Sequence, residues 1–335
     1  MKSAPAAILG AGAWGTTIAV MLARAGRPTT LCVRRHAQLD SFVERRENST
    51  YLPGIVFPSA LKIADRWAEA VREAGIVVMA IPSSFARATI SEVAGAIRPG
   101  TVVVSTTKGI EERTLLTMSA MLTALVAPGV KLAVLSGPGF AAEVAAGKPA
   151  ALVAAAPDEE TAREVQAIFS GSALRVYRSI DVRGVELAGA VKNVIAIATG
   201  IGDGLGLGSG ARAAVITRGL AEVTRLATAL GARRETIGGL AGLGDLVLTC
   251  TGELSRNRAL GVRLGRGEKV TEALRHGEGK PVAEGYANAR SIIELARATG
   301  VEMPIVEAVN RALYEAEAPR DIVEDLLSRE LKAEF

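Results

Sequence analysis

Short apolar runs recur along the first half of the chain, separated by longer segments of mixed character. Runs of this kind, rich in valine, isoleucine and alanine, are typical of buried β-strands. The predicted strands are Ala6–Leu9, Thr29–Val33, Gly75–Ser83, Thr101–Thr106, Leu132–Leu135, Ala150–Ala155 and Leu174–Tyr177. Helical segments are predicted between them, among them Thr16–Ala25 and Glu159–Phe169. This alternation predicts an α/β domain with a mostly parallel sheet.

The pattern changes after Asp181, where strand-like runs largely vanish and helical spacing continues to the C-terminus. We therefore predict two domains, an α/β domain over 1–180 and an all-α domain over 181–335. The glycine-rich stretch 200–210 is predicted to be an irregular loop between helices.

One apolar stretch of the predicted helical domain carries a lysine at its centre. Residues 185–198 are apolar enough for a buried helix, yet they include Lys192 and Asn193. Burying an ammonium group is costly and makes it lose its proton more easily, so Lys192 is a candidate acid or base. The alternative is a lysine whose stem runs along the apolar surface and whose charge reaches water.

A glycine-rich turn follows the first predicted strand. Gly10, Gly12 and Gly15 have the spacing Gly-x-Gly-x-x-Gly, between a strand and a helix, and a second strand follows. In this context the spacing predicts dinucleotide binding, because the turn and the helix N-terminus offer backbone N–H groups to a pyrophosphate. The second strand ends in Arg34 and Arg35 instead of an acidic residue. Guanidinium groups suit a 2′-phosphate, so NADP(H) is favoured and NAD(H) stays possible.

Further polar groups follow the later strands and helices. Lys108 comes directly after a predicted strand, where it could bind an anionic substrate or be an ordinary surface lysine. Asp245 and Thr249 are spaced to share one face of a helix, and Asp245 is a candidate partner of Lys192, a helix N-cap, or both. Residues 255–258 read Ser-Arg-Asn-Arg, which suits a phosphate but is also common at a helix start.

Composition narrows the function classes. The 335 residues are 49% hydrophobic and 22% charged, as in globular proteins, and charges interrupt the apolar runs before membrane-spanning length. The net charge of +4 and the 4% aromatic content do not support a nucleic-acid platform. Two cysteines fit a reducing compartment, and the strand pattern at the N-terminus leaves no room for a signal peptide, so a cytoplasmic protein is expected. Two histidines are too few for a histidine-rich metal site, and none is expected.

Taken together, these motifs resemble those of bacterial NAD(P)-dependent glycerol-3-phosphate dehydrogenases. The resemblance extends nearly end to end. It rests on the segments 10–15 (Gly-Ala-Gly-Ala-Trp-Gly), 107–109 (Thr-Lys-Gly), 136–138 (Ser-Gly-Pro), 189–194 (Gly-Ala-Val-Lys-Asn-Val), 242–246 (Gly-Leu-Gly-Asp-Leu), 255–258 and 282–285 (Val-Ala-Glu-Gly). It implies a Rossmann domain followed by a helical substrate domain. It also implies reversible hydride transfer between dihydroxyacetone phosphate and sn-glycerol 3-phosphate, which supplies phospholipid synthesis.

The resemblance also implies residue roles. Lys192 is expected to be the general acid/base, with the reacting end of the substrate surrounded by Lys108, Asn193, Asp245 and Thr249. The substrate is expected to contact Gly137 and to have its phosphate bound by Ser255, Arg256 and Asn257. The expected cofactor positions are Gly10, Gly12, Trp14, Gly15, Arg34, Arg35, Lys108, Ala142, Arg256, Val282 and Glu284.

One position departs from the family pattern. Similar proteins usually have serine or threonine after Ser-Gly-Pro, where this chain has Gly139, so backbone N–H groups would have to serve instead. The alternatives are a β-hydroxyacid or 6-phosphogluconate type dehydrogenase and a dinucleotide sensor without catalysis. A UDP-sugar dehydrogenase would need a nucleophilic cysteine, for which Cys250 is a weak candidate because it follows an apolar run. The apolar helical domain favours a homodimer.

Overall fold

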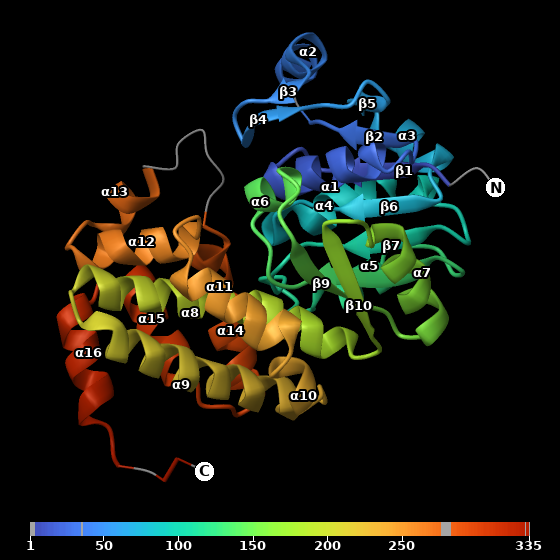
Figure 1. Ribbon diagram of the computed structural model, residues 1–335. Helices are drawn as coiled ribbons and strands as arrows, with labels where there is room; N and C mark the ends of the chain where they lie inside the picture. Colours follow the sequence, from blue (N-terminus) through green and yellow to red (C-terminus); the bar gives the residue numbers. More distant parts are fainter. Residues whose placement is uncertain (1–3, 35, 276–282, 332, 335) are drawn as a thin grey trace.

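The chain forms a layered α/β part followed by a cluster of helices (Figure 1). The computed structural model describes residues 4–34, 36–275, 283–331 and 333–334. The last strand ends at Ser179, and the first helix of the cluster begins at Val182.

The α/β part is organised around one eight-stranded sheet. Its strand order is β10-β9-β8-β7-β6-β1-β2-β5, and neighbouring strands are parallel except for the antiparallel pair β8 and β9. The strands are β1 (Ala6–Leu9), β2 (Thr29–Cys32), β5 (Leu61–Ala64), β6 (Ile76–Met79), β7 (Val102–Ser105), β8 (Lys131–Ser136), β9 (Ala150–Ala155) and β10 (Leu174–Ser179). The predicted mostly parallel sheet is therefore confirmed.

Helices cover both faces of this sheet, which explains why its central strands are apolar on both sides. One face packs against α1 (Ala13–Arg24), α2 (His36–Arg45) and α7 (Glu159–Phe169). The other packs against α3 (Trp67–Glu73), α4 (Ser83–Val93) and α5 (Met118–Thr123). A short 3₁₀ turn, η1 (Ala94–Ala96), follows α4, and α6 (Ala141–Ala145) lies beside α1.

Two parts of the α/β region differ from the sequence prediction. No strand was predicted between residues 34 and 74, but this segment contains the antiparallel pair β3 (Glu47–Asn48) and β4 (Leu52–Val56). Strand β5 was also missed. Both segments contain exposed or polar residues, so they lack the continuous apolar run that marks the inner strands.

The helical part is built around the long helix α8 (Val182–Gly204), which packs against several shorter helices. These are α9 (Gly208–Ala229), α10 (Arg234–Ile237), the π-helical turn η2 (Leu240–Gly244), α11 (Asp245–Thr251), α12 (Arg256–Gly265), α14 (Glu284–Ala298) and α15 (Pro304–Tyr314). The short helices α13 (Val270–Arg275) and α16 (Pro319–Ser328) lie against α12 and α15. Among the described residues, α8 is the one unbroken helix that is long and apolar enough to cross a bilayer. However, 94% of its most apolar 18-residue segment is buried inside the protein. Core packing therefore accounts for its apolar surface.

Helices α8 and α12 meet through facing glycines. A Cβ atom on Gly200 would lie 2.1 Å from the Arg258 carbonyl oxygen, and one on Gly261 would lie 2.1 Å from the Ile197 carbonyl oxygen. Gly204 and Gly265 repeat this contact one turn further along. The prediction of a loop over 200–210 was therefore wrong at both ends: residues 200–204 belong to α8 and residues 208–210 to α9, so that only 205–207 join the two helices. Glycine tolerates this close contact at Gly200, Gly204, Gly261 and Gly265. These glycines lie in helices because they allow two backbones to approach closely, and that tertiary contact outweighs the low helix propensity of glycine.

Candidate active site

A cavity of about 380 Å³ is lined by residues of both parts of the chain. Its walls come from the ends of β7 and β8, the start of α1, and helices α8, α11, α12 and α14. The lining includes the predicted residues Trp14, Lys108, Gly137, Ala142, Lys192, Asn193, Asp245, Thr249, Ser255, Arg256, Asn257 and Glu284. The fold thus brings together residues that are far apart in the sequence.

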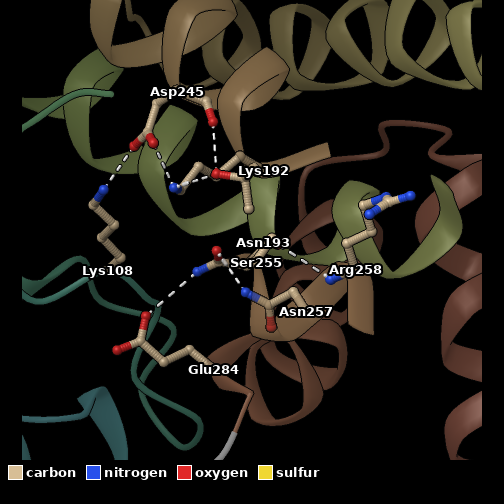
Figure 2. A network of polar contacts seen from close by, with 9 residues as sticks. Lys108, Lys192, Asn193, Asp245, Ser255, Asn257, Arg258 and Glu284 are labelled. Atoms are coloured by element: carbon tan, nitrogen blue, oxygen red, sulfur yellow. Dashed lines mark hydrogen bonds and ion pairs between the residues drawn. The ribbon is translucent and has the colours of Figure 1, made fainter. Parts of the chain in front are cut away.

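A buried carboxylate holds two lysines at one end of the cavity (Figure 2). Lys192 Nζ donates to Asp245 Oδ1 at 2.6 Å, and Lys108 Nζ donates to Asp245 Oδ2 at 2.6 Å. Lys192 Nζ also donates to Thr249 Oγ1 at 2.7 Å. The Thr249 hydroxyl in turn donates to the Asp245 carbonyl oxygen one helical turn earlier, at 2.6 Å. Asp245 and Thr249 therefore share one face of α11, as their spacing predicted.

Both alternatives to this arrangement are wrong. Lys192 does not reach water along the surface, because its side chain is only 8% exposed. Asp245 is not the N-cap of a helix, because Gly244 occupies that position of α11 and no side-chain capping hydrogen bond forms there.

The surroundings of Lys192 lower the pKa of its ammonium group. The pKa of Lys192 is lowered to about 8, chiefly because the group is buried, and the positive charge of Lys108 acts in the same direction. The negative charges of Asp245 and Glu284 oppose this effect. For Asp245, burial favours the neutral acid, but the two lysines outweigh burial and hold its pKa below the usual value. An ionised Asp245 therefore faces a lysine that can gain or lose a proton near neutral pH.

A chain of amide contacts joins three helices beside the lysines (Figure 2). Asn257 Nδ2 donates to Asn193 Oδ1 at 2.9 Å, and Asn193 Nδ2 donates to Glu284 Oε2 at 3.4 Å. The Gly285 backbone N–H donates to Asn257 Oδ1 at 3.0 Å. These contacts fix which end of each amide group donates and which accepts, and they connect α8, α12 and α14.

The start of α12 forms a cluster suited to an anion. Ser255 Oγ accepts from the Arg258 backbone N–H at 3.2 Å and so caps the helix. Arg258 Nε turns instead to Asp203, at 2.7 Å, whereas exposed Arg256 lines the cavity. The helix start expected from the sequence is therefore confirmed, and the same segment lines the cavity, whereas anion binding there stays a prediction. Unpaired N–H groups at a helix start attract negative charge, and an arginine adds two donors.

The glycine-rich turn joins β1 to α1. Gly10 has a φ of +110°, which favours glycine, and a Cβ atom on Gly15 would lie 2.0 Å from the Gly10 carbonyl oxygen. A Cβ atom on Gly12 would meet no atom within 4 Å, so space is open beside its backbone. These are the three conditions that the dinucleotide fingerprint requires: a tight turn, an open approach and close helix–strand packing.

Of the two predicted cofactor-selecting arginines, the structure describes Arg34, which lies outside the cavity lining. Arg34 Nη1 donates to Thr89 Oγ1, and its Nη2 forms an exposed ion pair with Glu92, both at 3.2 Å. Within the described part of the chain, Arg34 is not among the residues that line the cavity. Arg35 and Val282 lie outside the described residues.

The structure also adds residues that the sequence analysis did not single out. Thr50, Tyr51, Phe140 and Leu254 line the cavity. Thr50 and Tyr51 come from the β3–β4 turn. The sequence signal that could have indicated them is a tyrosine shortly before the turn-forming pair Pro53-Gly54. At Gly139 a Cβ atom would make ordinary contacts of 3.4 Å to Val144 and 3.6 Å to Trp14, so a side chain has room there.

Comparisons with known proteins match both parts of the chain. The family model described as the NAD-dependent glycerol-3-phosphate dehydrogenase N-terminus matches residues 5–162, and the corresponding C-terminus model matches residues 181–324. A glycerol-3-phosphate dehydrogenase [NAD(P)+] of Geobacter sulfurreducens is 49% identical over 98% of each chain. One from Anaeromyxobacter dehalogenans is 48% identical over 98% of this chain and 99% of its own. The crystal structure of a glycerol-3-phosphate dehydrogenase from Coxiella burnetii has a TM-score of 0.93 and 39% identity, covering 98% of this chain and 100% of that one.

Proposed function

We propose residue roles for an enzyme whose family is shown: the chain belongs to the NAD-dependent glycerol-3-phosphate dehydrogenases. It catalyses the NAD(P)H-dependent reduction of dihydroxyacetone phosphate to glycerol 3-phosphate. This assignment speaks against both alternatives, the hydroxyacid dehydrogenase and the dinucleotide sensor without catalysis. The observation that carries the proposed roles is the buried Lys192, held between Asp245 and Thr249 in the cavity wall.

Lys192 is proposed as the proton donor and acceptor. When bound, the dinucleotide supplies or accepts the hydride. During reduction, negative charge develops on the substrate carbonyl oxygen, and the Lys192 ammonium group stabilises this charge and gives up a proton to it. During oxidation, neutral Lys192 takes the proton from the substrate hydroxyl. A pKa of about 8 allows both forms near neutral pH.

The neighbours of Lys192 are proposed to orient and tune it. Asp245 and Thr249 hold Nζ in place by two hydrogen bonds. Lys108 adds a second positive charge toward the carbonyl oxygen and offsets the charge of Asp245. Asn193 lies next to this centre and links it to the amide chain.

The phosphate of the substrate is proposed to bind at the start of α12. Ser255, Arg256 and Asn257 line the cavity there, and the helix N-terminus adds its positive end. The amide contact of Asn257 with Asn193 leaves its Nδ2 group with a second N–H donor, which suits a phosphate oxygen. Gly137 would contact the substrate through its backbone.

The residues of the α/β part fit a dinucleotide. The open backbone at Gly12 and the start of α1 suit the pyrophosphate, and Trp14, Ala142 and Glu284 line the adjoining cavity. NAD(P)(H) serves as cofactor in this family. We further propose a preference for NADP(H), because Arg34 and Arg35, and no acidic residue, follow shortly after β2 in the sequence.

One assay tests this function and its cofactor preference. NADPH oxidation is followed by absorbance with dihydroxyacetone phosphate as substrate, and the assay is repeated with NADH. Rapid oxidation with a higher kcat/KM for NADPH is expected. No oxidation by a folded protein that binds NADPH would contradict the substrate assignment. An Arg34→Asp/Arg35→Asp variant should lower the NADPH-to-NADH ratio, and an unchanged ratio would contradict the role of these arginines.

Several broader expectations remain proposals. We propose that the chain divides into domains at 180/181, because the helical cluster begins at α8. We also propose a homodimer, a cytoplasmic location and a role in supplying phospholipid synthesis. Analytical ultracentrifugation of the purified protein would test the homodimer.

A further inference from the structure

The side chain of Asn48 is completely buried and uses every part of its amide group. It lies on β3, and none of its surface is exposed. Its Nδ2 group donates to the Ala11 carbonyl oxygen at 3.0 Å and to Thr16 Oγ1 at 2.8 Å. Its Oδ1 atom accepts from the Tyr51 backbone N–H at 3.1 Å. A buried amide with both donors and its acceptor paired is rigidly oriented.

These contacts connect the glycine-rich turn to the hairpin formed by β3 and β4. Ala11 lies between Gly10 and Gly12, and Thr16 lies on the first turns of α1. The peptide joining Ala11 to Gly12 is planar and trans, so its C=O and N–H groups point in opposite directions. By binding the Ala11 carbonyl, Asn48 directs the Gly12 N–H to the opposite side, away from the hairpin. Without this hydrogen bond, the flexible backbone at Gly10 and Gly12 would allow the Ala11–Gly12 peptide plane to adopt other orientations.

The same side chain places the β3–β4 turn at the cavity. Its contact with Tyr51 fixes the backbone of the segment that contributes Thr50 and Tyr51 to the cavity wall. One amide therefore links the turn before α1 to a second segment that lines the site.

We infer that Asn48 is a positioning residue for the dinucleotide, which sets the orientation of the Ala11–Gly12 peptide and the position of Tyr51. This inference rests on the proposed dinucleotide site, and it adds a residue to which no role has been assigned above. Because the pyrophosphate is common to both cofactors, Asn48 acts on NADPH and NADH equally.

The test is an Asn48→Asp variant. The carboxylate has nearly the same shape and retains the acceptor for Tyr51, but it lacks both donors and places a negative charge at the Ala11 carbonyl oxygen. We expect the Kd for NADPH, measured by fluorescence titration, to rise about tenfold or more, the size associated with losing one or two hydrogen bonds. The Kd for NADH should rise by the same factor. The KM for the cofactor should follow, whereas kcat at saturating cofactor and the KM for dihydroxyacetone phosphate should change by less than about twofold.

Thr29→Val is the matched control. Thr29 is buried in the same domain and donates one hydrogen bond, to the Arg27 carbonyl oxygen at 2.9 Å, at the far end of β2. It should lower Tm without changing the Kd for NADPH. A merely structural defect in the Asn48 variant would reduce the fraction of binding-competent protein and leave the titration midpoint unchanged.

An unchanged Kd in folded Asn48→Asp would overturn the inference, as would a change in the NADPH-to-NADH ratio. If this variant does not fold, Asn48→Ser is titrated instead, with the same expectation. The proposed function is judged separately, by turnover of the wild-type enzyme. Wild type that binds NADPH but does not reduce dihydroxyacetone phosphate would refute that function, while the titrations would still decide the role of Asn48.

Discussion

The Nζ atom of Lys192 lies 2.6 Å from Oδ1 of Asp245 in a contact that joins α8 to α11 and is almost fully buried. Burial and the Asp245 carboxylate shift the pKa of Lys192 in opposite directions. Burial makes the lysine easier to deprotonate, whereas the carboxylate favours its charged form. Their balance leaves both protonation states accessible near neutral pH.

Replacing Lys192 should abolish most of the turnover. For Lys192→Ala we expect kcat to fall by about 10²–10⁴-fold, the usual contribution of a positioned acid or base. The Kd for NADPH should stay close to that of wild type. Lys131→Ala, which removes a half-exposed lysine on β8, is the control and should retain full activity. Near-normal turnover by folded Lys192→Ala would exclude the assigned role.

The pH dependence should have opposite signs in the two directions. Oxidation of glycerol 3-phosphate needs neutral Lys192, so kcat/KM should rise with pH and level off above about 8. Reduction needs the ammonium form, so kcat/KM should be level below about 8 and fall above it. Profiles of kcat/KM in both directions check this, because that ratio reports ionisation of the free enzyme. Parallel profiles would contradict a single lysine acting in both directions.

Removing the charge of Asp245 should shift these profiles. Asp245 raises the pKa of Lys192, so Asp245→Asn should move the apparent pKa below 8 in both directions. The variant should also be less stable, because Lys108 and Lys192 lose their shared carboxylate. A shift to higher pH would show that the carboxylate does not act on Lys192 as described.

The α8–α12 contact should not tolerate a methyl group. We expect Gly200→Ala to lower the free energy of unfolding by at least about 1–3 kcal/mol, because the added carbon would overlap the α12 backbone. Gly202→Ala is the matched control on the same helix, since its Cβ atom would meet only Leu207, at 3.8 Å. It should be neutral or stabilising by up to about 1 kcal/mol. Thermal or denaturant unfolding of both variants measures the difference, and equal effects would exclude close packing as the cause.

A hydroxyl should be accepted at Gly139 but a methyl should not be accepted at Gly137. The backbone at Gly139 has room for a side chain, so Gly139→Ser should fold with an unchanged Tm and retain turnover. Gly137 has a φ of +136°, and its Cβ atom would lie 3.1 Å from Leu152 Cα, so Gly137→Ala should be strained. Measuring Tm and kcat/KM for both variants tests whether the Gly137 backbone, and not a missing side chain, shapes this part of the cavity.

The sequence predicted the features that depend on local pattern. Inner strands such as β9 are continuous apolar runs, and α7 begins with an aspartate cap, so both were found at their observed bounds. The spacing of Asp245 and Thr249 predicted a shared helix face. The glycine spacing also predicted the turn before α1.

The features that were missed depend on tertiary contacts. Gly200 and Gly204 look like loop residues because glycine disfavours helices, and only the facing backbone of α12 explains their helical state. Asn48 looks like any polar residue until the fold places Ala11 within its reach. The cofactor role of Arg34 stays a prediction, but its contacts with Thr89 and Glu92 of α4 are tertiary contacts that sequence spacing does not predict.

Helix α8 carries Lys192 at the centre of the most buried element of the helical part. Backbone amides in such a core exchange with solvent deuterium only when the whole unit opens, unlike those of mobile surface loops. The amide of Lys192 should therefore be among the slowest to exchange in the protein. Lys192 is exposed only when this core unfolds. Local opening of surface segments should therefore leave catalysis intact, and the temperature of heat inactivation should coincide with the Tm of cooperative unfolding.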